Sequence, residues 1–472
     1  MPSHDVPRRN SPRRDLSRLI KAYDVRGLVP DELDEELAQG VGAALVTLTG
    51  ARRVVVGRDM RPSSPALAAA LADGASAAGA DVVDIGLAAT DQLYFASGWL
   101  DCPGAMITAS HNPARYNGIK LCRAGAAPVG QDTGLREVRR LLEEGLPAPA
   151  ASPGAQTSRD VLPDYVAHLL SLVDLADARP LTVVVDAGNG MAGHTVPAVF
   201  DALTQKVPFR LVPLYFELEG TFPHHEANPL EPANLRDLRA RVRAEGADLG
   251  FAFDGDADRC FAVDERGEIV SPSVTTALIA ARELAKEPGA TVIHNLITSR
   301  AVPEIVREHG GVPVRTRVGH SFIKEKMAET GAVFGGEHSA HFYFRDFWGA
   351  DTGMLAALHT LAACAETPKG TTLSALLAQY TRYVASGELN STVADPAAAA
   401  ERVRRAFEGR EGARVDVLDG LTIDAPDWWF NLRPSNTEPL LRLNVEAVDR
   451  VTMERVRDDV LALVREAPVV TR

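Results

Sequence analysis

The sequence predicts an α/β protein in which three related α/β domains are followed by a smaller α+β domain. Three β-branched runs, at residues 52–60, 181–193 and 290–300, each lead into a polar turn and then a small-residue or amphipathic segment. This is the pattern of a strand, a turn and a helix, and it occurs three times. The length of 472 residues also suits three or four domains.

The second and third strands of each predicted domain follow in the same order. The second strands are expected in "ADVVDIGLAAT" (80–90), "FRLVPLYFEL" (209–218) and "GVPVRTRVGHSF" (311–322). The third are expected in "GAMITASHNP" (104–113), "ADLGFAFDGDADR" (247–259) and "GAVFGGEHSAHF" (331–342), and each runs into a polar cluster. Apolar strands that alternate with helices are typical of mostly parallel sheets, in which ligands gather at the carboxyl ends of strands. We therefore expect each polar cluster at the functional edge of its domain; chance similarity among α/β units is the alternative.

The carboxyl-terminal part has a different pattern. Residues 413–449 are strand-rich with turns, and residues 451–467 have the spacing of an amphipathic helix, so we expect a small α+β domain. The expected domain boundaries are 21–159, 160–268, 269–381 and 382–472.

Residues 1–20 combine arginine with Pro, Ser and Asn and show no apolar periodicity. They predict a disordered basic tail, with an arm for nucleic acid or an anionic surface as the alternative. The tail also lacks the uninterrupted apolar core of a secretory signal.

The composition excludes several classes of protein. A formal charge of −13 argues against nucleic acid as the main ligand, and no apolar run is long enough to span a membrane. The four cysteines are far apart and form no C-x-x-C pair, which fits neither a zinc knuckle nor a dense disulfide framework. We expect a soluble cytoplasmic protein that binds neither nucleic acid nor a membrane.

Ser110 lies in "ITASHNP", the first polar cluster, beside His111. It is either a nucleophile or a turn residue. The G-x-S-x-G elbow of hydrolases is absent around it, so a catalytic triad is not expected.

The second cluster, "FAFDGDADRCFAV", alternates Asp254, Asp256 and Asp258, which in an extended segment would point to one side. Clustered carboxylates repel one another unless a cation lies among them, and hard oxygen ligands suit Mg²⁺ or Ca²⁺. Glu265 is the twelfth residue from Asp254, as in a calcium loop, but the sixth is Arg259 where an EF-hand needs glycine. We therefore expect Mg²⁺, and a phosphoryl group on Ser110 could complete its ligand shell.

Two further clusters suit a phosphorylated sugar. In "GGEHSAHFYF", Glu337, Ser339 and His341 alternate and could bind vicinal hydroxyls, unless the histidines only cap strand ends. In "LRPSNTEPLLRLNVEA" a guanidinium, hydroxyls and loop amides could cradle a phosphate; these belong to Arg433, Ser435, Asn436 and Thr437. The alternative is a helix capping box, but the residues that follow alternate as a strand does.

Tyr23 and Arg26 in "KAYDVRG" and Lys120 in "NGIK" flank the nucleophile candidate in the sequence. Each could belong to the site or be a surface residue.

Taken in order, the four clusters match the signatures T-A-S-H-N-P, D-G-D-x-D-R, G-E-x-S-x-H and R-x-S-N-T-x-P of the α-D-phosphohexomutase family. From Lys21 onward the chain resembles this family, and within it the phosphomannomutase/phosphoglucomutase group. The resemblance implies three α/β domains with mixed, mostly parallel sheets and a C-terminal α+β (TATA-binding-protein-like) domain around a central cleft.

The resemblance also implies the reaction. Phosphorylated Ser110 would pass its phosphoryl group to a hexose 1-phosphate or 6-phosphate, and the hexose 1,6-bisphosphate would turn over and return the other phosphate. Mannose phosphates, and glucose phosphates as well, are the expected substrates, with Mg²⁺ and hexose 1,6-bisphosphate as cofactors. We expect a monomer or a weak dimer.

By matching positions, the resemblance assigns roles to the clusters. The three aspartates and Ser110 would hold Mg²⁺, the third cluster the sugar hydroxyls, and the fourth the non-reacting phosphate. His111 and Arg259 would lie beside the phosphoserine, and His320 would contact the sugar. Lys120, Arg26 and His341 would move protons and stabilise charge. Ala340 stands where many relatives have glycine, which leaves the sugar preference open.

Three other functions remain in view. A phosphoglucosamine mutase shares the mechanism but usually has glycine at the position of Asn436. A sensor on the same fold would bind sugar phosphates without catalysis, although Ser110 and the aspartates are intact. A Mg²⁺-dependent phosphatase would let water intercept the phosphoserine.

Overall fold

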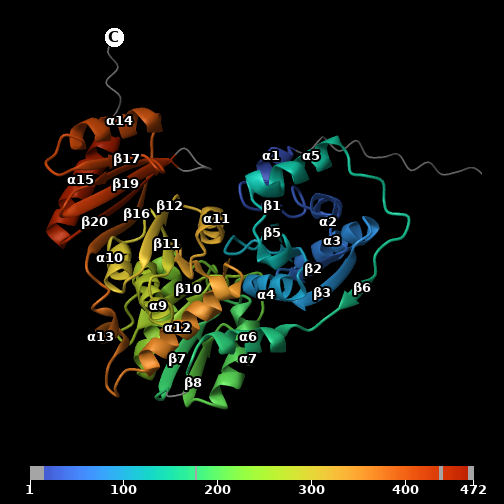
Figure 1. Cartoon of the computed structure of the whole chain (residues 1–472), viewed down its shortest axis with the longest axis horizontal. Coiled ribbons are helices and arrows are strands. Elements are labelled where there is room, and N and C mark those ends of the chain that lie inside the picture. The colour runs from blue at the N-terminus through green and yellow to red at the C-terminus, as the bar shows by residue number, and fades with distance from the viewer. Residues whose placement is uncertain (1–14, 176–177, 435–439, 466–472) are drawn as a thin grey trace, which may run out of the picture.

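The computed structural model describes residues 15–175, 178–434 and 440–465 (Figure 1). The prediction of a disordered tail over residues 1–20 is wrong for its last part, because Leu16–Leu19 form the short helix α1. Leu16 and Leu19, three residues apart, put two apolar side chains on one face of that turn, and both are buried. Residues 1–14 lie outside the described part.

The first sheet has six strands in the order β1-β5-β4-β2-β3-β6. β2, β3, β4 and β6 are parallel, whereas β5 is antiparallel to β4 and to β1. The strands are β1 (Val25–Leu28), β2 (Arg53–Arg58), β3 (Asp81–Leu87), β4 (Gly104–Ile107), β5 (Tyr116–Cys122) and β6 (Gln156–Ser158). The helices of this part are α2 (Glu35–Thr49), α3 (Ser64–Ala77), α4 (Thr90–Leu100) and α5 (Arg136–Glu144).

Helices cover both faces of the first sheet. Val54 and Val56 of β2 belong to the core that includes α2 and α3, whereas Val55 belongs to the core that includes Leu93 of α4. Successive side chains of a strand point to opposite faces, so a sheet covered on both sides needs a continuous apolar run such as "VVV".

The second sheet repeats this arrangement in the order β10-β9-β7-β8. β8, β7 and β9 are parallel neighbours, and β10 returns antiparallel to β9. The strands are β7 (Leu181–Asp186), β8 (Phe209–Leu214), β9 (Leu249–Phe253) and β10 (Cys260–Asp264). The helices are α6 (Leu162–Leu172), α7 (Ala192–Thr204) and α8 (Arg236–Glu245).

The third sheet has the order β12-β11-β13-β14-β15, again with an antiparallel strand after the third parallel one. The strands are β11 (Thr291–Asn295), β12 (Val312–Thr316), β13 (Phe334–Gly336), β14 (Phe342–Phe344) and β15 (Ala350–Asp351). The helices are α9 (Pro272–Lys286), α10 (Ala301–Glu308), α11 (His320–Thr330), α12 (Gly353–Ala365) and α13 (Leu373–Leu377). The shared strand order confirms three related α/β units with mixed, mostly parallel sheets.

The fourth sheet is antiparallel throughout its described strands, in the order β16-β20-β19-β18-β17. The strands are β16 (Val384–Thr392), β17 (Arg414–Asp416), β18 (Leu421–Asp424), β19 (Trp428–Pro434) and β20 (Leu440–Ala447). α14 (Pro396–Phe407) and α15 (Arg450–Arg465) pack against it and share its own apolar core. This confirms the predicted α+β unit.

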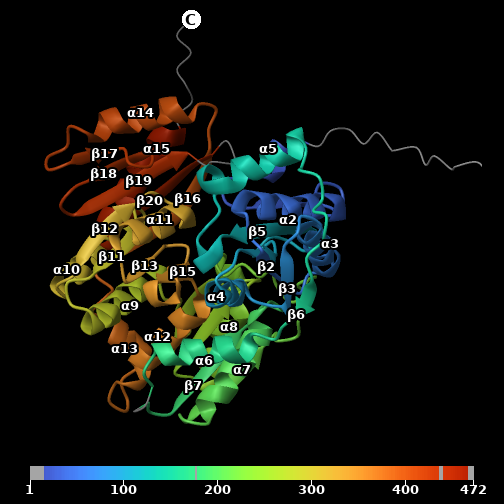
Figure 2. The same cartoon turned by 45° about the vertical axis from the view of Figure 1, so that its right-hand side comes forward.

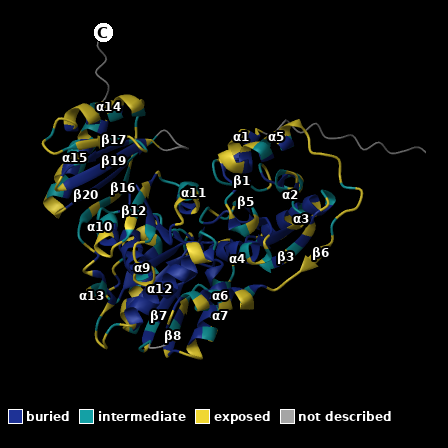
Figure 3. Ribbon diagram, viewed as in Figure 1, coloured by how far each residue is buried: buried dark blue, intermediate teal, exposed yellow. Residues whose placement is uncertain are grey.

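The first three units form one body, because a single apolar core includes residues of the first, second and third sheets. Figures 1 and 2 both place the fourth unit beside the third. Arg300 of the third unit joins the third and fourth units, since its guanidinium donates to the backbone carbonyls of Pro426 and Ala425. Figure 3 shows burial concentrated in the sheets, and an exposed segment that runs through β6. Among the described helices, none has the length and apolar character that crossing a membrane requires.

Candidate active site

Ser110 lies in the turn that follows β4, at the carboxyl end of that strand. Its backbone is left-handed, with φ of 50°, and its side chain is buried. The hydroxyl Oγ donates a hydrogen bond to Oδ2 of Asp254 at 2.7 Å and lies 3.2 Å from Nδ1 of His111. The loops of the first two sheets therefore meet at this hydroxyl.

The three aspartates lie in the turn between β9 and β10, not in an extended segment as expected. β10 runs antiparallel to β9, so the chain must reverse here, and Ala257 adopts φ of 60° within the turn. The reversal still gathers the carboxylates, because one oxygen of each lies within 4.8 Å of the others. All three side chains are buried.

Two cations offset the charge of this carboxylate cluster. Nζ of Lys120 donates to Oδ2 of Asp256 at 2.7 Å and to Oδ2 of Asp258 at 2.5 Å. The guanidinium of Arg259 donates to Oδ2 of Asp254 at 2.7 and 2.9 Å. Burial opposes the ionisation of Asp256, but the charge of Lys120 outweighs it and lowers the pKa. Burial raises the pKa of Asp254 to about 7 against the opposing effect of Arg259.

The cluster fits a hard divalent cation. Its donors are all carboxylate oxygens, which Mg²⁺ and Ca²⁺ prefer. Oδ1 of Asp256 and Oδ1 of Asp258 are buried, and within the described ranges neither accepts a hydrogen bond. Buried carboxylate oxygens without donors are costly, and a cation held by them would remove that cost.

The third cluster is also a turn, since β13 ends at Gly336 and β14 begins at Phe342. Ala340 has φ of 65° there, so the expected alternation along a strand is wrong. Ser339 Oγ lies 3.0 Å from Nδ1 of His341 and 3.4 Å from Oε2 of Glu337. Tyr343 Oη and Nδ2 of Asn295 donate to the Glu337 carboxylate at 2.5 and 3.2 Å. The turn thus keeps the three predicted side chains together.

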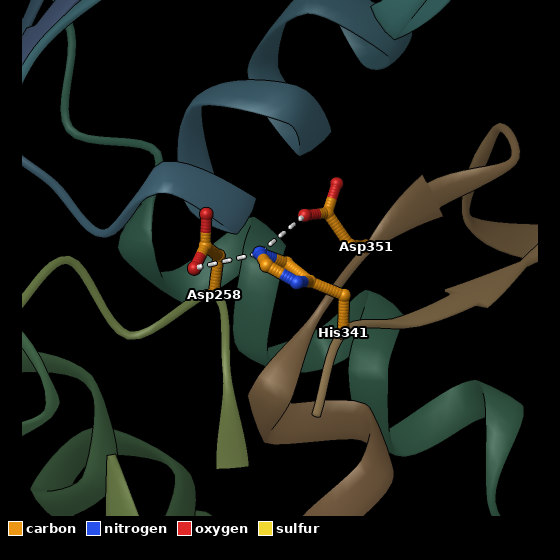
Figure 4. A group of neighbouring side chains, drawn as sticks. All are labelled: Asp258, His341 and Asp351. Atoms are coloured by element: carbon orange, nitrogen blue, oxygen red, sulfur yellow. Dashed lines mark ion pairs between the residues drawn. The ribbon is translucent and has the colours of Figure 1, made fainter. Parts of the chain in front are cut away.

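The turn between β9 and β10, here called the metal loop, touches the turn between β13 and β14, here called the sugar loop. The contact is an antiparallel β-bridge between Arg259 and His341. Figure 4 shows the imidazole of His341 between two carboxylates. Its Nε2 lies 3.8 Å from Oδ1 of Asp258 and 3.9 Å from Oδ2 of Asp351. These contacts extend the site from the second unit into the third.

Asp351 and Lys324 are site residues that the sequence did not reveal. Nζ of Lys324 contacts Oδ1 of Asp351 at 2.7 Å, and both side chains are nearly inaccessible to solvent. Burial opposes the ionisation of Asp351, but Lys324 outweighs it and lowers the pKa. Lys324 lies in α11 and Asp351 in the short strand β15, and no sequence motif marked either.

The first unit supplies further side chains. Nη1 of Arg26 donates to Oδ1 of Asn112 at 2.7 Å and to the Ala109 carbonyl at 3.2 Å. The guanidinium of Arg259 lies 2.5 Å from Nδ1 of His111. Burial, with the charges of Arg259 and Arg26, holds the pKa of His111 well below its usual value. His111 is therefore neutral at physiological pH.

Tyr23 and His320 meet across the first and third units, with ring centroids 4.6 Å apart. The His320 ring also lies 6.4 Å from the ring of His341. Burial lowers the pKa of His320 to about 3, so its imidazole is neutral. Both rings are thus placed near the sugar loop.

Of the four predicted phosphate ligands, Arg433 lies near the end of β19, within the described residues. Ser435, Asn436 and Thr437 lie outside the described residues. Nη2 of Arg433 donates to Oε2 of Glu388 at 2.8 Å. Burial lowers the pKa of His338 in the third cluster; Glu388 opposes this shift and Arg433 adds to it. Among the described residues, this hydrogen bond of Arg433 goes to Glu388 and not to a predicted sugar ligand.

Comparison with known proteins supports one family. Models described as phosphoglucomutase/phosphomannomutase alpha/beta/alpha domains I, II and III match residues 17–146, 163–267 and 272–383. The model of the C-terminal domain of the same family matches residues 388–463.

Individual proteins agree with the family models. The chain is 42% identical over 453 residues to a phosphomannomutase from Escherichia coli, covering 94% of this chain and 99% of the relative. It is 45% identical over 430 residues to a protein from Xanthomonas campestris pv. campestris named phosphohexose mutases, covering 90% and 94%. A crystal structure of a phosphoglucomutase/phosphomannomutase family protein from Burkholderia thailandensis is 35% identical, with a TM-score of 0.85 over 95% of this chain and 97% of that one.

Proposed function

Because the chain belongs to the phosphoglucomutase/phosphomannomutase family, we propose that it transfers a phosphoryl group reversibly between C1 and C6 of a hexose phosphate. The observation that carries this proposal is the hydrogen bond from Ser110 to Asp254, which puts a buried hydroxyl at the edge of a carboxylate cluster. A serine needs such assistance to donate and accept a phosphoryl group.

In the proposed reaction, phosphorylated Ser110 is the donor. The bond between Oγ and phosphorus breaks while the hexose hydroxyl oxygen forms a new bond to the same phosphorus, and the proton of that hydroxyl passes to a nearby base. The hexose 1,6-bisphosphate then turns over, and its other phosphoryl group returns to Oγ. Oγ thus serves as leaving group in one half-reaction and nucleophile in the other.

The cationic side chains around Ser110 suit this chemistry. Arg259 and Lys120 are held by the carboxylates of the metal loop and lie where charge develops on the transferring group. Arg26 is bound to the same loop as Ser110. We propose Lys120, Arg26 and His341 as the groups that stabilise charge and move the proton, with neutral His111 beside the phosphoserine.

We propose Mg²⁺ as the cation of the carboxylate cluster, with Asp254, Asp256 and Asp258 and an oxygen on Ser110 as its ligands. When bound, Mg²⁺ draws charge from the phosphoryl oxygens and so lowers the barrier to transfer. The all-oxygen donor set and the two carboxylate oxygens without a hydrogen bond support this choice.

The remaining predicted residues would bind the sugar and its second phosphate. Glu337, Ser339 and His341 are assembled in one turn, with Tyr23 and His320 beside it, and could accept and donate hydrogen bonds to hydroxyls. For the non-reacting phosphate we propose a site in the fourth unit formed by Arg433, Ser435, Asn436 and Thr437. Both ends of the sugar must be bound in either orientation, which explains why several units contribute. We propose that the four domains end at residues 159, 268, 381 and 472.

The cellular setting is also proposed. The four cysteines are free and buried, which suits a reducing compartment, and we propose the cytoplasm. We propose a hexose phosphate as the partner, with hexose 1,6-bisphosphate as activator, and a monomeric or weakly dimeric chain.

A phosphorus NMR time course tests the function. Purified protein with Mg²⁺ and a trace of glucose 1,6-bisphosphate is given mannose 1-phosphate, glucose 1-phosphate or glucosamine 1-phosphate. We expect conversion of the mannose and glucose phosphates to their 6-phosphates, with glucosamine 1-phosphate slower, since Asn436 stands where phosphoglucosamine mutases usually have glycine.

Other outcomes would favour other functions. Fastest conversion of glucosamine 1-phosphate would identify a phosphoglucosamine mutase. Release of inorganic phosphate without isomerisation would identify a phosphatase, and binding without any conversion would identify a sensor.

A further inference from the structure

Arg61 is a buried arginine that belongs to none of the sequence motifs. It lies next to the loop between β4 and β5, here called the serine loop, which carries Ser110. It follows β2 and is 1% exposed. Arginine side chains are seldom fully buried unless every donor is satisfied, so its partners show what it holds.

All five N–H groups of the Arg61 guanidinium have an acceptor. Nη2 donates to the carbonyls of Ser110 at 2.8 Å and Asn112 at 2.7 Å. Nη1 donates to the carbonyls of Pro113 and Tyr116, each at 3.0 Å. Nε donates to Oδ2 of Asp59 at 3.1 Å. One planar group thus binds four carbonyls of the loop that carries the nucleophile.

The serine loop needs such support. Ser110 has a left-handed backbone, which is unfavourable for a residue other than glycine and persists only where its surroundings enforce it. Its carbonyl is fixed on one side by Arg61 and packs on the other against Gly255 of the metal loop, where a Cβ atom would approach the oxygen to 2.4 Å. The fixed carbonyl holds the backbone of Ser110 where its Oγ reaches Asp254 at 2.7 Å.

A second group of contacts fixes Arg61 itself. Oδ1 of Asp59 accepts from the backbone N–H of Arg61 at 3.0 Å and from the hydroxyl of Ser64 at 2.5 Å. Nδ2 of Asn117, on β5, donates to the same Ser64 hydroxyl. From the second unit, the ring of Phe222 lies 5.1 Å from the guanidinium carbon and shields it from water.

We propose that Arg61 is a positioning residue for phosphoryl transfer: its guanidinium holds the carbonyls of residues 110–116 so that Ser110 Oγ stays aligned with the metal loop. The proposal rests on the function proposed above. In the described part of the chain, the guanidinium of Arg61 donates to carbonyls of residues 110–116 and to Asp59 and not to a predicted sugar ligand, so it acts on the transfer step and not on hexose phosphate binding.

The test compares Arg61→Lys with Arg179→Lys in single-turnover experiments on the full chain. Lysine keeps the charge but has one nitrogen, which cannot reach all the acceptors that lie around the edge of a guanidinium. Arg179 is a matched control, because it donates to the carbonyls of Pro180 and Thr371 and to the Asp248 carboxylate at the amino end of β7, the opposite end from the site. Each protein is phosphorylated with glucose 1,6-bisphosphate, checked by intact mass, and mixed with glucose 6-phosphate.

The amplitude of phosphoryl transfer measures the fraction of protein that is folded. The rate constant of the transfer measures how well Ser110 Oγ is aligned with the metal loop. For Arg61→Lys we expect a rate constant about 100-fold lower, at the wild-type amplitude and with the KM for hexose phosphate changed by less than about threefold. For Arg179→Lys we expect the wild-type rate constant. A reduced amplitude with an unchanged rate constant would show a merely structural role and overturn the proposal.

Two further measurements keep the result decisive. If Arg61→Lys does not fold, Asp59→Asn removes the charge that orients the guanidinium and should lower the rate constant about tenfold; no change would overturn the proposal. The wild-type protein separates this proposal from the function, because failure of wild type to transfer at all would refute both, whereas normal transfer by wild type and Arg61→Lys alike would refute only the role of Arg61.

Discussion

Ser110 depends for its chemistry on side chains from other elements. Asp254 of the second unit accepts its hydrogen bond, and Arg259 and Lys120 neutralise the carboxylates around it. The motifs that contain Ser110, Asp254 and Arg259 could be read from the sequence because each follows a predicted strand, whereas Lys120 could be either a site residue or a surface residue. The contacts between different motifs could not be read from it, since they join residues more than 130 positions apart, such as Lys120 and Asp256.

Replacing Ser110 should abolish turnover without unfolding the protein. For Ser110→Ala we expect kcat to fall by about 10³-fold or more, because the phosphoryl group then has no acceptor on the enzyme. Ser76→Ala is a matched control, since its hydroxyl is similarly buried and donates to the Gly154 carbonyl away from the site. Steady-state assays and thermal melts check this; substantial residual mutase activity in Ser110→Ala would contradict the donor role.

Lys324 and Asp351 form a buried ion pair whose disruption should cost stability. Asp351→Asn leaves the ammonium of Lys324 buried without its opposite charge, and we expect the free energy of unfolding to fall by about 3 kcal/mol. Glu144→Gln, which removes an exposed ion-pair partner of Arg140, should change the free energy of unfolding little. Urea titrations of the two variants and wild type measure the difference; equal stability of all three would refute a structural role for the pair.

At the scale of elements, three equivalent turns carry the site. Each follows the third parallel strand of its sheet, and each contains one residue other than glycine in the left-handed region: Ser110, Ala257 and Ala340. Sequence reasoning placed the turns correctly but treated the second and third clusters as extended. It failed there because period-two alternation of polar residues is common to strands and to tight turns between antiparallel strands.

Ala340 tests the geometry of the sugar turn. Ala340→Gly should leave stability within about 1 kcal/mol of wild type, because relief of the left-handed strain offsets the greater flexibility of glycine. Ala340→Val should lower stability by about 2 kcal/mol or more and raise the KM for hexose phosphate, since a β-branched residue is strongly disfavoured at positive φ. Urea titration and steady-state kinetics measure both effects; a valine variant as stable as wild type would contradict this backbone geometry.

At the scale of the whole molecule, a buried carboxyl group links three units. Asp91 of α4 accepts hydrogen bonds at Oδ2 from Tyr165 of α6 at 2.8 Å and from Thr352, which precedes α12, at 2.7 Å. Burial raises the pKa of Asp91 to about 7, against the opposing effect of these two hydrogen bonds. The repeated strand order predicted the separate units, but this junction joins residues far apart in the sequence, and no local pattern marks it.

The raised pKa predicts a pH dependence of stability. An unfolded aspartate loses its proton near pH 4, whereas native Asp91 keeps it until about pH 7, so the native state binds more protons and stability falls as the pH rises between these values. Asp91→Asn cannot titrate. We therefore expect that, from pH 5 to pH 7.5, the wild-type protein loses about 2–3 kcal/mol more of its free energy of unfolding than the variant does. Urea titrations at both values measure this, and identical losses would contradict the raised pKa.

The fate of a phosphoryl group on Ser110 decides whether this serine is the phosphoryl donor and acceptor. The protein is incubated with glucose 1,6-bisphosphate and Mg²⁺, separated from ligand, and digested to locate the modified residue by mass spectrometry; a second portion is mixed with hexose 6-phosphate. We expect phosphorylation at Ser110 and transfer of this phosphoryl group to the sugar, with one hexose 1,6-bisphosphate formed for each phosphoserine consumed. An unmodified Ser110, or a phosphoserine that yields only inorganic phosphate, would contradict this expectation.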